Sequence, residues 1–147
     1  MDISLKPIDQ SNYSVVCDLA VTDYQSEYVA CNMWSLVEAA YNPGYTCRAI
    51  YLQSIAVGFI MWVRETPVKI SIWRLMVDVH FQSQGIGKAA LALAIEYIRQ
   101  IDGIREIEIS YSPANRIARS FYGSLGFKEV GLDESGKDLM AVITLNN

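Results

Sequence analysis

The sequence predicts one α+β domain over residues 1–147, built on a mixed central sheet of about six or seven strands with about four flanking helices. Two observations lead to this fold class. In the first half, short helical segments precede β-branched and aromatic runs separated by tight turns, an order typical of antiparallel strands. In the second half, a long helical period lies between two strand-like runs, which predicts a crossover and a parallel pair.

The N-terminal part is predicted to hold one strand and two helices. Residues 2–7 alternate as a short strand. Apolar residues at helical spacing over 15–20 predict a first helix, with Asp9 or Ser11 as its N-cap. Apolar positions over 29–40 predict a second helix, and an Asn-Pro-Gly sequence stops it.

Three strands are expected next. Residues 46–52 and 56–63 are rich in β-branched and aromatic side chains, and Gln53-Ser54 between them predicts a hairpin turn. Thr66-Pro67 breaks the second run, and residues 69–77 form the third strand. These strands are expected to be antiparallel.

The second half predicts a crossover followed by a final hairpin. Residues 86–101 repeat at the helical period, and residues 107–111 alternate as a strand that a right-handed crossover places parallel to the 69–77 strand. A further helix is expected to begin with Ser112 as N-cap and to close at Gly126. The final hairpin is predicted from residues 127–130 and 139–145.

Composition excludes several function classes. A net charge of −4 and a pI near 4.9 argue against a nucleic-acid partner. Three cysteines without a CxxC pair and a single histidine exclude a multi-His metal site and favour a reduced protein without a metal. The chain starts without signal-peptide features, and its longest apolar run, residues 55–63, is too short to cross a bilayer. We therefore expect a cytoplasmic protein without a membrane partner.

The most informative stretch is Gln82-Ser83-Gln84-Gly85-Ile86-Gly87-Lys88. It follows the apolar run Leu75-Met76-Val77 and opens the long helix. The first amides of a helix lack intrahelical partners and carry partial positive charge, so a glycine-containing loop at this point can bind a phosphate. Lys88 adds a formal charge. The expected ligand is a nucleotide, a dinucleotide or coenzyme A.

These three ligands make different demands on the sequence. The loose dinucleotide fingerprint is present from Gly85, with Glu106 and Glu108 near the expected acidic position, but that fold needs its glycines directly after a strand in a repeated strand–helix series. The P-loop pattern needs Ser or Thr where this chain has Ala89. Coenzyme A is the third ligand, and the rest of the chain favours it.

Two motifs together resemble the GNAT-type N-acetyltransferases, which transfer acetyl from acetyl-CoA to an amine. The first is Leu-Met-Val followed by Gln-x-x-Gly-x-Gly, over residues 75–87. The second lies over residues 115–131, and residues 69–131 carry both motifs in the right order and spacing. The second motif consists of Asn115, Ala118, Phe121-Tyr122, Leu125-Gly126-Phe127, Lys128 and Gly131. The resemblance implies a GNAT-like domain with a centrally splayed sheet.

Within that superfamily the chain is most similar in look to small bacterial diamine and spermidine acetyltransferases. Arg74, Asp78 and the tail from Leu132 to Met140 carry this resemblance. The chain departs from the pattern at Trp73, where such relatives have an acid, and at Ser71, where they have Trp. A polyamine or diamine acceptor is what the resemblance implies.

The resemblance also assigns roles within the cofactor site. Tyr122 would be the general acid for the leaving thiolate, since a phenol pKa of about 10 is close enough to a thiol pKa of about 8.5 for proton transfer. Helical spacing alone would make Tyr122 a packed aromatic. Asn115, about two helical turns earlier, would contact the pantetheine. The implied cofactor residues are Leu75, Met76, Val77, Gln82, Ser83, Gln84, Gly85, Ile86, Gly87, Lys88, Asn115 and Tyr122.

The acceptor side is less defined by the sequence. Glu27 and Glu38 are candidates for the general base or for ammonium binding, and Trp34 and Trp73, with Tyr24 and Tyr28, are candidates for cation–π contacts. The general base is not readable, and a homodimer is left open. The alternatives are acetylation of another amine (an antibiotic, an amino acid or a protein N-terminus) and a non-catalytic acyl-CoA-binding module.

Overall fold

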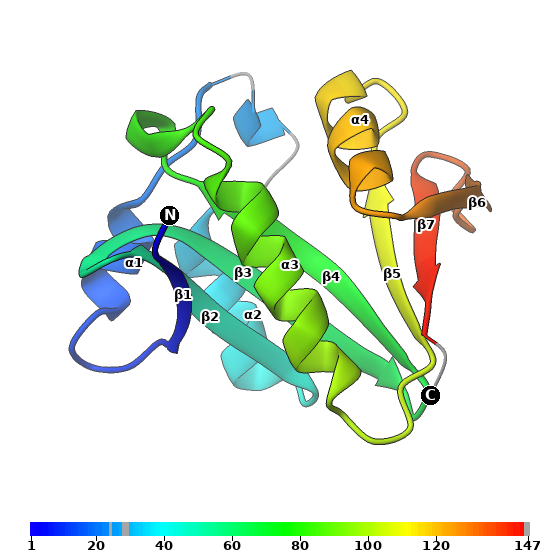
Figure 1. Cartoon of the computed structure of the whole chain (residues 1–147), viewed down its shortest axis with the longest axis horizontal. Helices are drawn as coiled ribbons and strands as arrows, with labels where there is room; N and C mark the ends of the chain where they lie inside the picture. Colours follow the sequence, from blue (N-terminus) through cyan, green and yellow to red (C-terminus); the bar gives the residue numbers. More distant parts are fainter. Residues whose placement is uncertain (24, 28–29, 146–147) are drawn as a thin grey trace.

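The computed structural model describes residues 1–23, 25–27 and 30–145, in which one seven-stranded sheet has the order β1-β2-β3-β4-β5-β7-β6 (Figure 1). All neighbouring strands are antiparallel except β4 and β5, which are parallel. The predicted mixed α+β sheet is confirmed. The elements are β1 (Ile3–Pro7), α1 (Tyr13–Asp18), η1 (Gln25–Glu27), α2 (Asn32–Tyr41), β2 (Tyr45–Leu52), β3 (Ile55–Thr66), β4 (Lys69–Val77), η2 (Val79–Phe81), α3 (Ile86–Arg99), β5 (Glu106–Tyr111), α4 (Arg116–Ser124), β6 (Lys128–Leu132) and β7 (Leu139–Thr144).

Two predicted helix starts are wrong. Neither Asp9 nor Ser11 caps α1, because the Asp9 carboxylate accepts from the Ser11 backbone N–H (2.9 Å) and hydroxyl (2.6 Å) and so closes the turn before the helix. Similarly, Ser112 does not cap α4. Its carbonyl and hydroxyl accept from residues 115 and 114 in a preceding turn, and α4 begins at Arg116 with Asn115 as N-cap.

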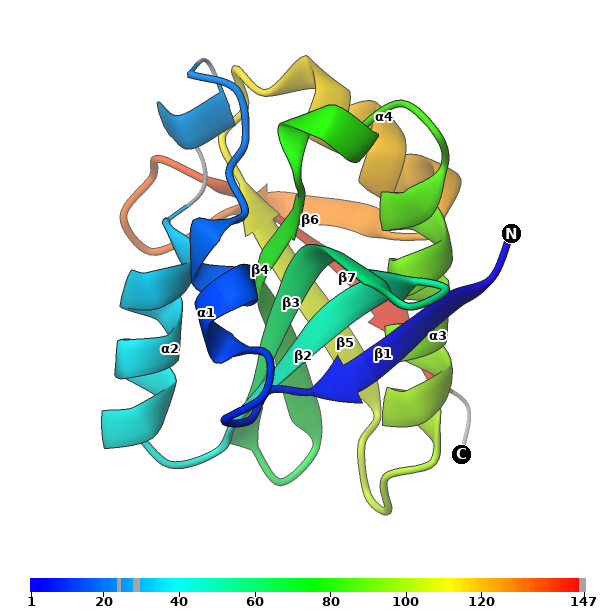
Figure 2. The same cartoon turned by 90° about the vertical axis from the view of Figure 1, so that its left-hand side faces the viewer.

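The helices cover both faces of the sheet, with α3 on one face and α1 and α2 on the other (Figure 2). Ile86, Leu91 and Ile98 of α3 pack into the larger buried cluster, which includes the inward side chains of the central strands. Val16 of α1 lies in the smaller cluster, with Phe59 of β3 and other apolar residues beneath α2. Val29, part of the predicted pattern of α2, lies outside the described residues.

The sheet opens at its centre, as the resemblance implied. Strand β4 pairs with β5 only from Lys69 to Ile72, and beyond this point the two strands diverge toward α4 (Figure 1). The diverging part of β4 contains a bulge, because Met61 pairs with Arg74 and the next residue, Trp62, pairs with Ile72. Trp73 is therefore the extra residue. Among the described residues, the far half of β4 consequently has no strand on its β5 side.

The bulge changes which side chains of β4 face each layer. Before it, Ile70 and Ile72 pack in the cluster beneath α3; after it, Leu75 and Val77 do so. A regular strand would keep one parity throughout. The extra residue therefore restores an apolar face toward α3 along the strand end.

Among the described helices, none is both long and apolar enough to cross a membrane. The cytoplasmic location stays a prediction. The described part of the chain also contains no cluster of three or more His, Cys, Asp or Glu side chains arranged to hold a metal ion.

Candidate active site

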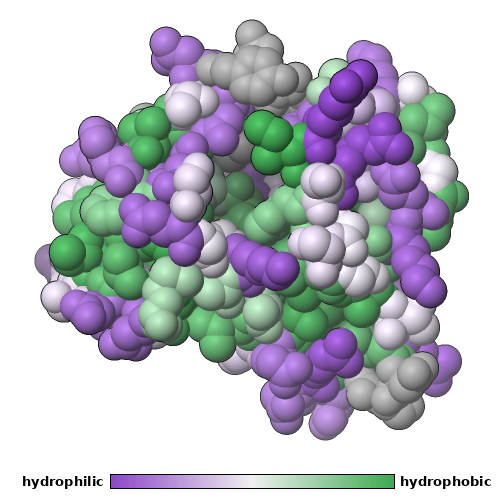
Figure 3. Space-filling model, turned by 45° about the horizontal axis from the view of Figure 1, so that its top comes forward, coloured by the Kyte–Doolittle hydropathy of each residue, from purple (hydrophilic) through white to green (hydrophobic). Residues whose placement is uncertain are grey.

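Two cavities meet where the sheet opens. The loop-side cavity, of about 530 Å³, lies between the end of β4, the loop over 82–88 and α4. The sheet-side cavity, of about 520 Å³, lies between the diverging strands and the β6–β7 turn. The two share four lining residues: Leu75, Asn115, Ala118 and Tyr122. Figure 3, in which the top of the molecule comes forward, shows a hollow with apolar and hydrophilic residues along its rim.

The loop that begins α3 is shaped by its glycines. Gly85 occupies the N-cap position with φ +83°, a left-handed conformation that suits glycine, and no side chain caps the helix. A Cβ on Gly87 would lie 3.6 Å from Val77 Cγ2 and 3.7 Å from Phe121 Cζ. Gly87 and Lys88 line the loop-side cavity, so the start of α3 presents its uncapped first turn to this cavity.

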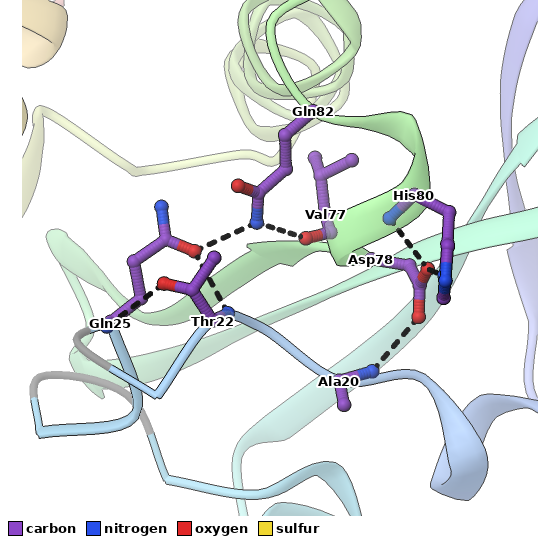
Figure 4. A network of polar contacts seen from close by, with 7 residues as sticks. All are labelled: Ala20, Thr22, Gln25, Val77, Asp78, His80 and Gln82. Atoms are coloured by element: carbon purple, nitrogen blue, oxygen red, sulfur yellow. Dashed lines mark hydrogen bonds and ion pairs between the residues drawn. The ribbon is translucent and has the colours of Figure 1, made fainter.

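Gln82 fastens this loop to two other elements (Figure 4). Its side-chain Nε2 donates to the Val77 carbonyl and to the Gln25 carboxamide, both at 2.8 Å. Gln25 in turn exchanges hydrogen bonds with Thr22, through its Oε1 and its backbone N–H. The motif glutamine therefore joins the strand end to the segment before α2.

Asp78 makes a second connection directly beside the first (Figure 4). Its carboxylate, only 10% exposed, accepts from the Ala20 N–H (3.0 Å), the His80 N–H (3.0 Å) and His80 Nδ1 (2.9 Å). Burial by itself would raise the pKa of Asp78, but these donors and the His80 charge outweigh it and lower the pKa. His80, the single histidine, points outward with its side chain 82% exposed and has a structural role.

Tyr122 stands between the two cavities and lines both. Its ring stacks on Tyr111 (centroids 5.6 Å apart, planes at 25°) and meets the edges of Phe121 and Phe127 at 5.0 and 5.9 Å. Burial raises the pKa of Tyr122, and the nearby Tyr111 adds to the effect. Within the described residues its hydroxyl has no hydrogen-bond partner. The phenol is therefore neutral and free to donate.

Asn115 also lines both cavities, but its carboxamide oxygen has a structural task. It accepts from the Ala118 N–H at 3.1 Å and so caps α4. Asn115 is therefore the residue before the helix, whereas a helix capped by Ser112 would have placed it in the first turn. Its side-chain NH₂ makes no hydrogen bond to the described residues.

The wall of the sheet-side cavity is rich in carboxylates. Glu108 of β5 pairs with Lys69 at 3.2 Å, and Glu65 of β3 contacts the same ammonium at 3.6 Å. Across the cavity lie two carboxylates of the β6–β7 turn. Of these, Asp133 accepts hydrogen bonds within its own turn, whereas the Asp138 carboxylate has no partner among the described residues. The four acidic lining residues are Glu65, Glu108, Asp133 and Asp138.

These acids were missed by the sequence reasoning. The signal that was present is weak: Glu106 and Glu108 alternate with isoleucines in one predicted strand, and Asp133 belongs to the tail that carried the polyamine resemblance. Glu65 and Asp138 had no distinguishing pattern. Their common position depends on four strands meeting around the opening of the sheet.

The predicted acceptor residues are only partly brought together. Trp73 lines the sheet-side cavity, and its indole N–H donates to Glu65 at 3.1 Å. Glu38 forms an ion pair with Arg74 at 3.3 Å and lines neither cavity. Trp34 is 64% exposed and also lines neither. The side chain of Glu27, together with Tyr24 and Tyr28, lies outside the described residues.

All the predicted cofactor residues except Gln84 line the loop-side cavity. The sheet itself excludes the dinucleotide alternative, because β3 and β4 are an antiparallel hairpin rather than part of a repeated parallel series. The sequence profile described as the "Acetyltransferase (GNAT) family" matches residues 13–127. The chain belongs to this family.

Relatives of this acetyltransferase agree with that assignment. A "Probable spermine N(1)-acetyltransferase" of Bacillus subtilis subsp. natto is 27% identical over 148 residues, covering 95% of this chain and 97% of the relative. The structure of a spermidine N-acetyltransferase from Vibrio cholerae in complex with CoA and spermine superposes with a TM-score of 0.77, at 14% identity, covering 97% of this chain and 95% of the other. The ribosomal-protein-S18-alanine N-acetyltransferase of Escherichia coli has a TM-score of 0.70, at 15% identity, covering 98% and 93%. The last two likenesses concern the fold alone.

Proposed function

We propose that this acetyltransferase transfers the acetyl group of acetyl-CoA to a primary amine of a polyamine or diamine, with Tyr122 as general acid. The observation that carries the proposal is the junction of two unlike cavities at one tyrosine. One cavity ends at an uncapped helix N-terminus with Lys88, and the other is walled by carboxylates. Such a pair suits an anionic donor and a cationic acceptor.

The loop-side cavity would hold the coenzyme. Amides over residues 83–88 and Lys88 would bind the pyrophosphate, as helix N-termini bind phosphates elsewhere. Within the part of the chain that the structure describes, the β5 side of β4 has no strand partner after Ile72, so backbone groups of the Leu75–Val77 end are available to an extended ligand. The pantetheine arm, which carries two amides, would add there like a short strand and direct its thioester toward Tyr122.

Transfer then follows from direct attack. The neutral amine nitrogen attacks the thioester carbonyl, the C–S bond breaks, and the thiolate takes the phenolic proton of Tyr122; the amine releases its extra proton to water. A raised pKa keeps Tyr122 protonated before the reaction. Donation to the thiolate is feasible because the sulfur develops its charge in the same partly buried junction, where burial raises the thiol pKa as well.

The sheet-side cavity favours an acceptor that carries more than one positive charge. Lys69 is shared between Glu65 and Glu108, Arg74 is neutralised by Glu38, and the carboxylates of Asp133 and Asp138 lie opposite. The cavity therefore keeps an excess of negative charge for the non-reacting ammoniums. The similarity to the Bacillus subtilis relative named for spermine supports the same class of acceptor.

The test is thiol release from acetyl-CoA with spermidine and with a monoamine of similar length. We expect spermidine to be preferred, and Asp138→Asn to raise the KM for spermidine about 2- to 10-fold with little change for the monoamine, since one partly exposed charge contact is worth roughly 0.5–1.4 kcal/mol. Glu134→Gln, in the same turn but outside both cavities, is the control. Equal use of the two amines would refute the polyamine assignment and leave the acetyl transfer intact.

Tyr122→Phe tests the general acid separately. The change keeps the aromatic packing and removes only the proton donor. Turnover is expected to fall at least about 10-fold, since general acid–base contributions are typically 10²–10⁴-fold and water replaces part of the function. Unchanged turnover would reduce Tyr122 to a packing residue. Absence of thiol release with any amine would favour the non-catalytic acyl-CoA-binding module.

A further inference from the structure

Behind Tyr122 lies a chain of contacts that the proposed reaction does not itself require. Tyr111, at the end of β5, is 8% exposed, and its ring stacks on that of Tyr122 at 5.6 Å. The Tyr111 hydroxyl donates to Glu129 Oε2 at 2.9 Å. The same carboxylate accepts from Arg119 Nε at 3.1 Å and from its Nη2 at 3.2 Å, in a two-point contact.

These contacts join the three elements that surround Tyr122. Arg119 and Tyr122 are three residues apart on α4, Glu129 is on β6, and Tyr111 is on β5. Phe127, just before β6, closes the other side of the Tyr122 ring. The Tyr122 ring therefore packs against three aromatic rings, and the only polar anchor of that aromatic stack among the described residues is the Tyr111 hydroxyl.

We propose that Tyr111, anchored by Glu129 and Arg119, is the positioning residue that orients the Tyr122 ring at the junction of the two cavities. This inference rests on the proposed function of Tyr122. Its physical basis is that β5 lacks its β4 neighbour at this level, because the paired register ends at Ile109. At Tyr111, β7 is the one described strand that pairs with β5, so the Glu129 bond adds a tie from β6 to the end of β5.

The arrangement also separates the roles of the two tyrosines. Burial and the Glu129 carboxylate raise the pKa of Tyr111 to about 12, so it remains a neutral donor to Glu129. Its proton is engaged with that carboxylate, whereas the hydroxyl of Tyr122 has no such partner. Only Tyr122 is therefore free to deliver a proton to a thiolate, and Tyr111 acts through it.

A double-mutant cycle on turnover tests the inference. Tyr111→Phe keeps the stacked ring and removes the Glu129 bond; we expect kcat to fall about 3- to 10-fold with the KM for acetyl-CoA within about twofold, since loss of orientation acts on the chemical step. In the Tyr122→Phe background the same change should have almost no further effect. Glu129→Gln is expected to reproduce a smaller part of the loss. Tyr41→Phe, at an 84% exposed tyrosine, is the control.

The outcomes separate this inference from the proposed function. If the effect of Tyr111→Phe on kcat disappears in the Tyr122→Phe background, positioning is supported. An equal effect in both backgrounds, or no effect in either, overturns the inference. In those two cases the proposed function still stands as long as the wild type turns over. A second experiment does not depend on activity: the rate of ring flipping of Tyr122 is measured by NMR in the wild type and in Tyr111→Phe. Faster flipping in Tyr111→Phe supports the inference, and unchanged flipping overturns it, even for a protein that turns over no tested amine.

Discussion

Gly58 lies in β3 beside the Leu75–Val77 end of β4, and we predict that Gly58→Ala destabilises the protein. Gly58 pairs with Val77 in the β3–β4 ladder and with Ile50 in the β2–β3 ladder. A Cβ at this position would lie 2.5 Å from the Met76 carbonyl oxygen and 3.1 Å from Ile50 Cδ1. The carbonyl belongs to the backbone, so the clash cannot be relieved by turning a side chain.

The magnitude follows from two opposing effects. Overpacking that displaces backbone typically costs about 1–3 kcal/mol. Alanine also loses less conformational freedom on folding than glycine, which returns roughly 0.5–1 kcal/mol. The middle of each range gives a net loss of about 1.3 kcal/mol, which for a chain of this size lowers the melting temperature by about 3–5 °C.

Thermal unfolding with and without acetyl-CoA measures both consequences. Because Met76 must move, we also expect acetyl-CoA to stabilise the Gly58→Ala variant less than the wild type. Gly123→Ala is the matched control: Gly123 is the next-to-last residue of α4 and a Cβ there meets nothing within 4 Å, so this change should stabilise the helix slightly, by up to about 0.5 kcal/mol. A Gly58→Ala variant as stable as the wild type would refute the close approach of β3 to β4.

Two further predictions concern the loop and its attachments. Asp78→Asn is expected to cost about 1–3 kcal/mol near pH 7, because two backbone donors and His80 lose a charged acceptor. Since the folded-state pKa of Asp78 lies below its ordinary value of 3.8, its contribution is present above that value and is lost as pH falls through the folded pKa. Denaturant titrations of wild type and Asp78→Asn should therefore converge at low pH, and a constant difference down to pH 2 would contradict this cause. Gly87→Asp should keep its own melting temperature within a few degrees, since a Cβ there has ordinary contacts, yet lose the stabilisation by acetyl-CoA because a carboxylate would face the phosphates. Retention of that stabilisation, with Gly87→Ala as control, would mean that the phosphates bind elsewhere.

Local pattern was sufficient for most elements. Strand alternation over 69–77, the helical period over 86–101 and the turn at Gln53-Ser54 all correspond to observed elements, because each depends on neighbours only a few residues away. The loop over 82–88 could likewise be recognised, since its glycines and the helix it opens are contiguous. The helix starts failed at Asp9 and Ser112 because several polar residues competed for the cap, and the choice depends on the turn before the helix.

The acceptor side depended on the tertiary structure. The bulge at Trp73 arises from the pairing of β3 with β4, and the carboxylates of Glu65, Glu108 and Asp138 come from three different parts of the chain. Residues far apart in sequence become neighbours only through the register of the strands and the place where they diverge. The helical and strand periodicities of the sequence do not specify either. By itself, the sequence identified the family, and it predicted a phosphate-binding loop over residues 82–88 and Tyr122 as the general acid. Only the folded sheet, by opening between β4 and β5, decided which charges that tyrosine faces.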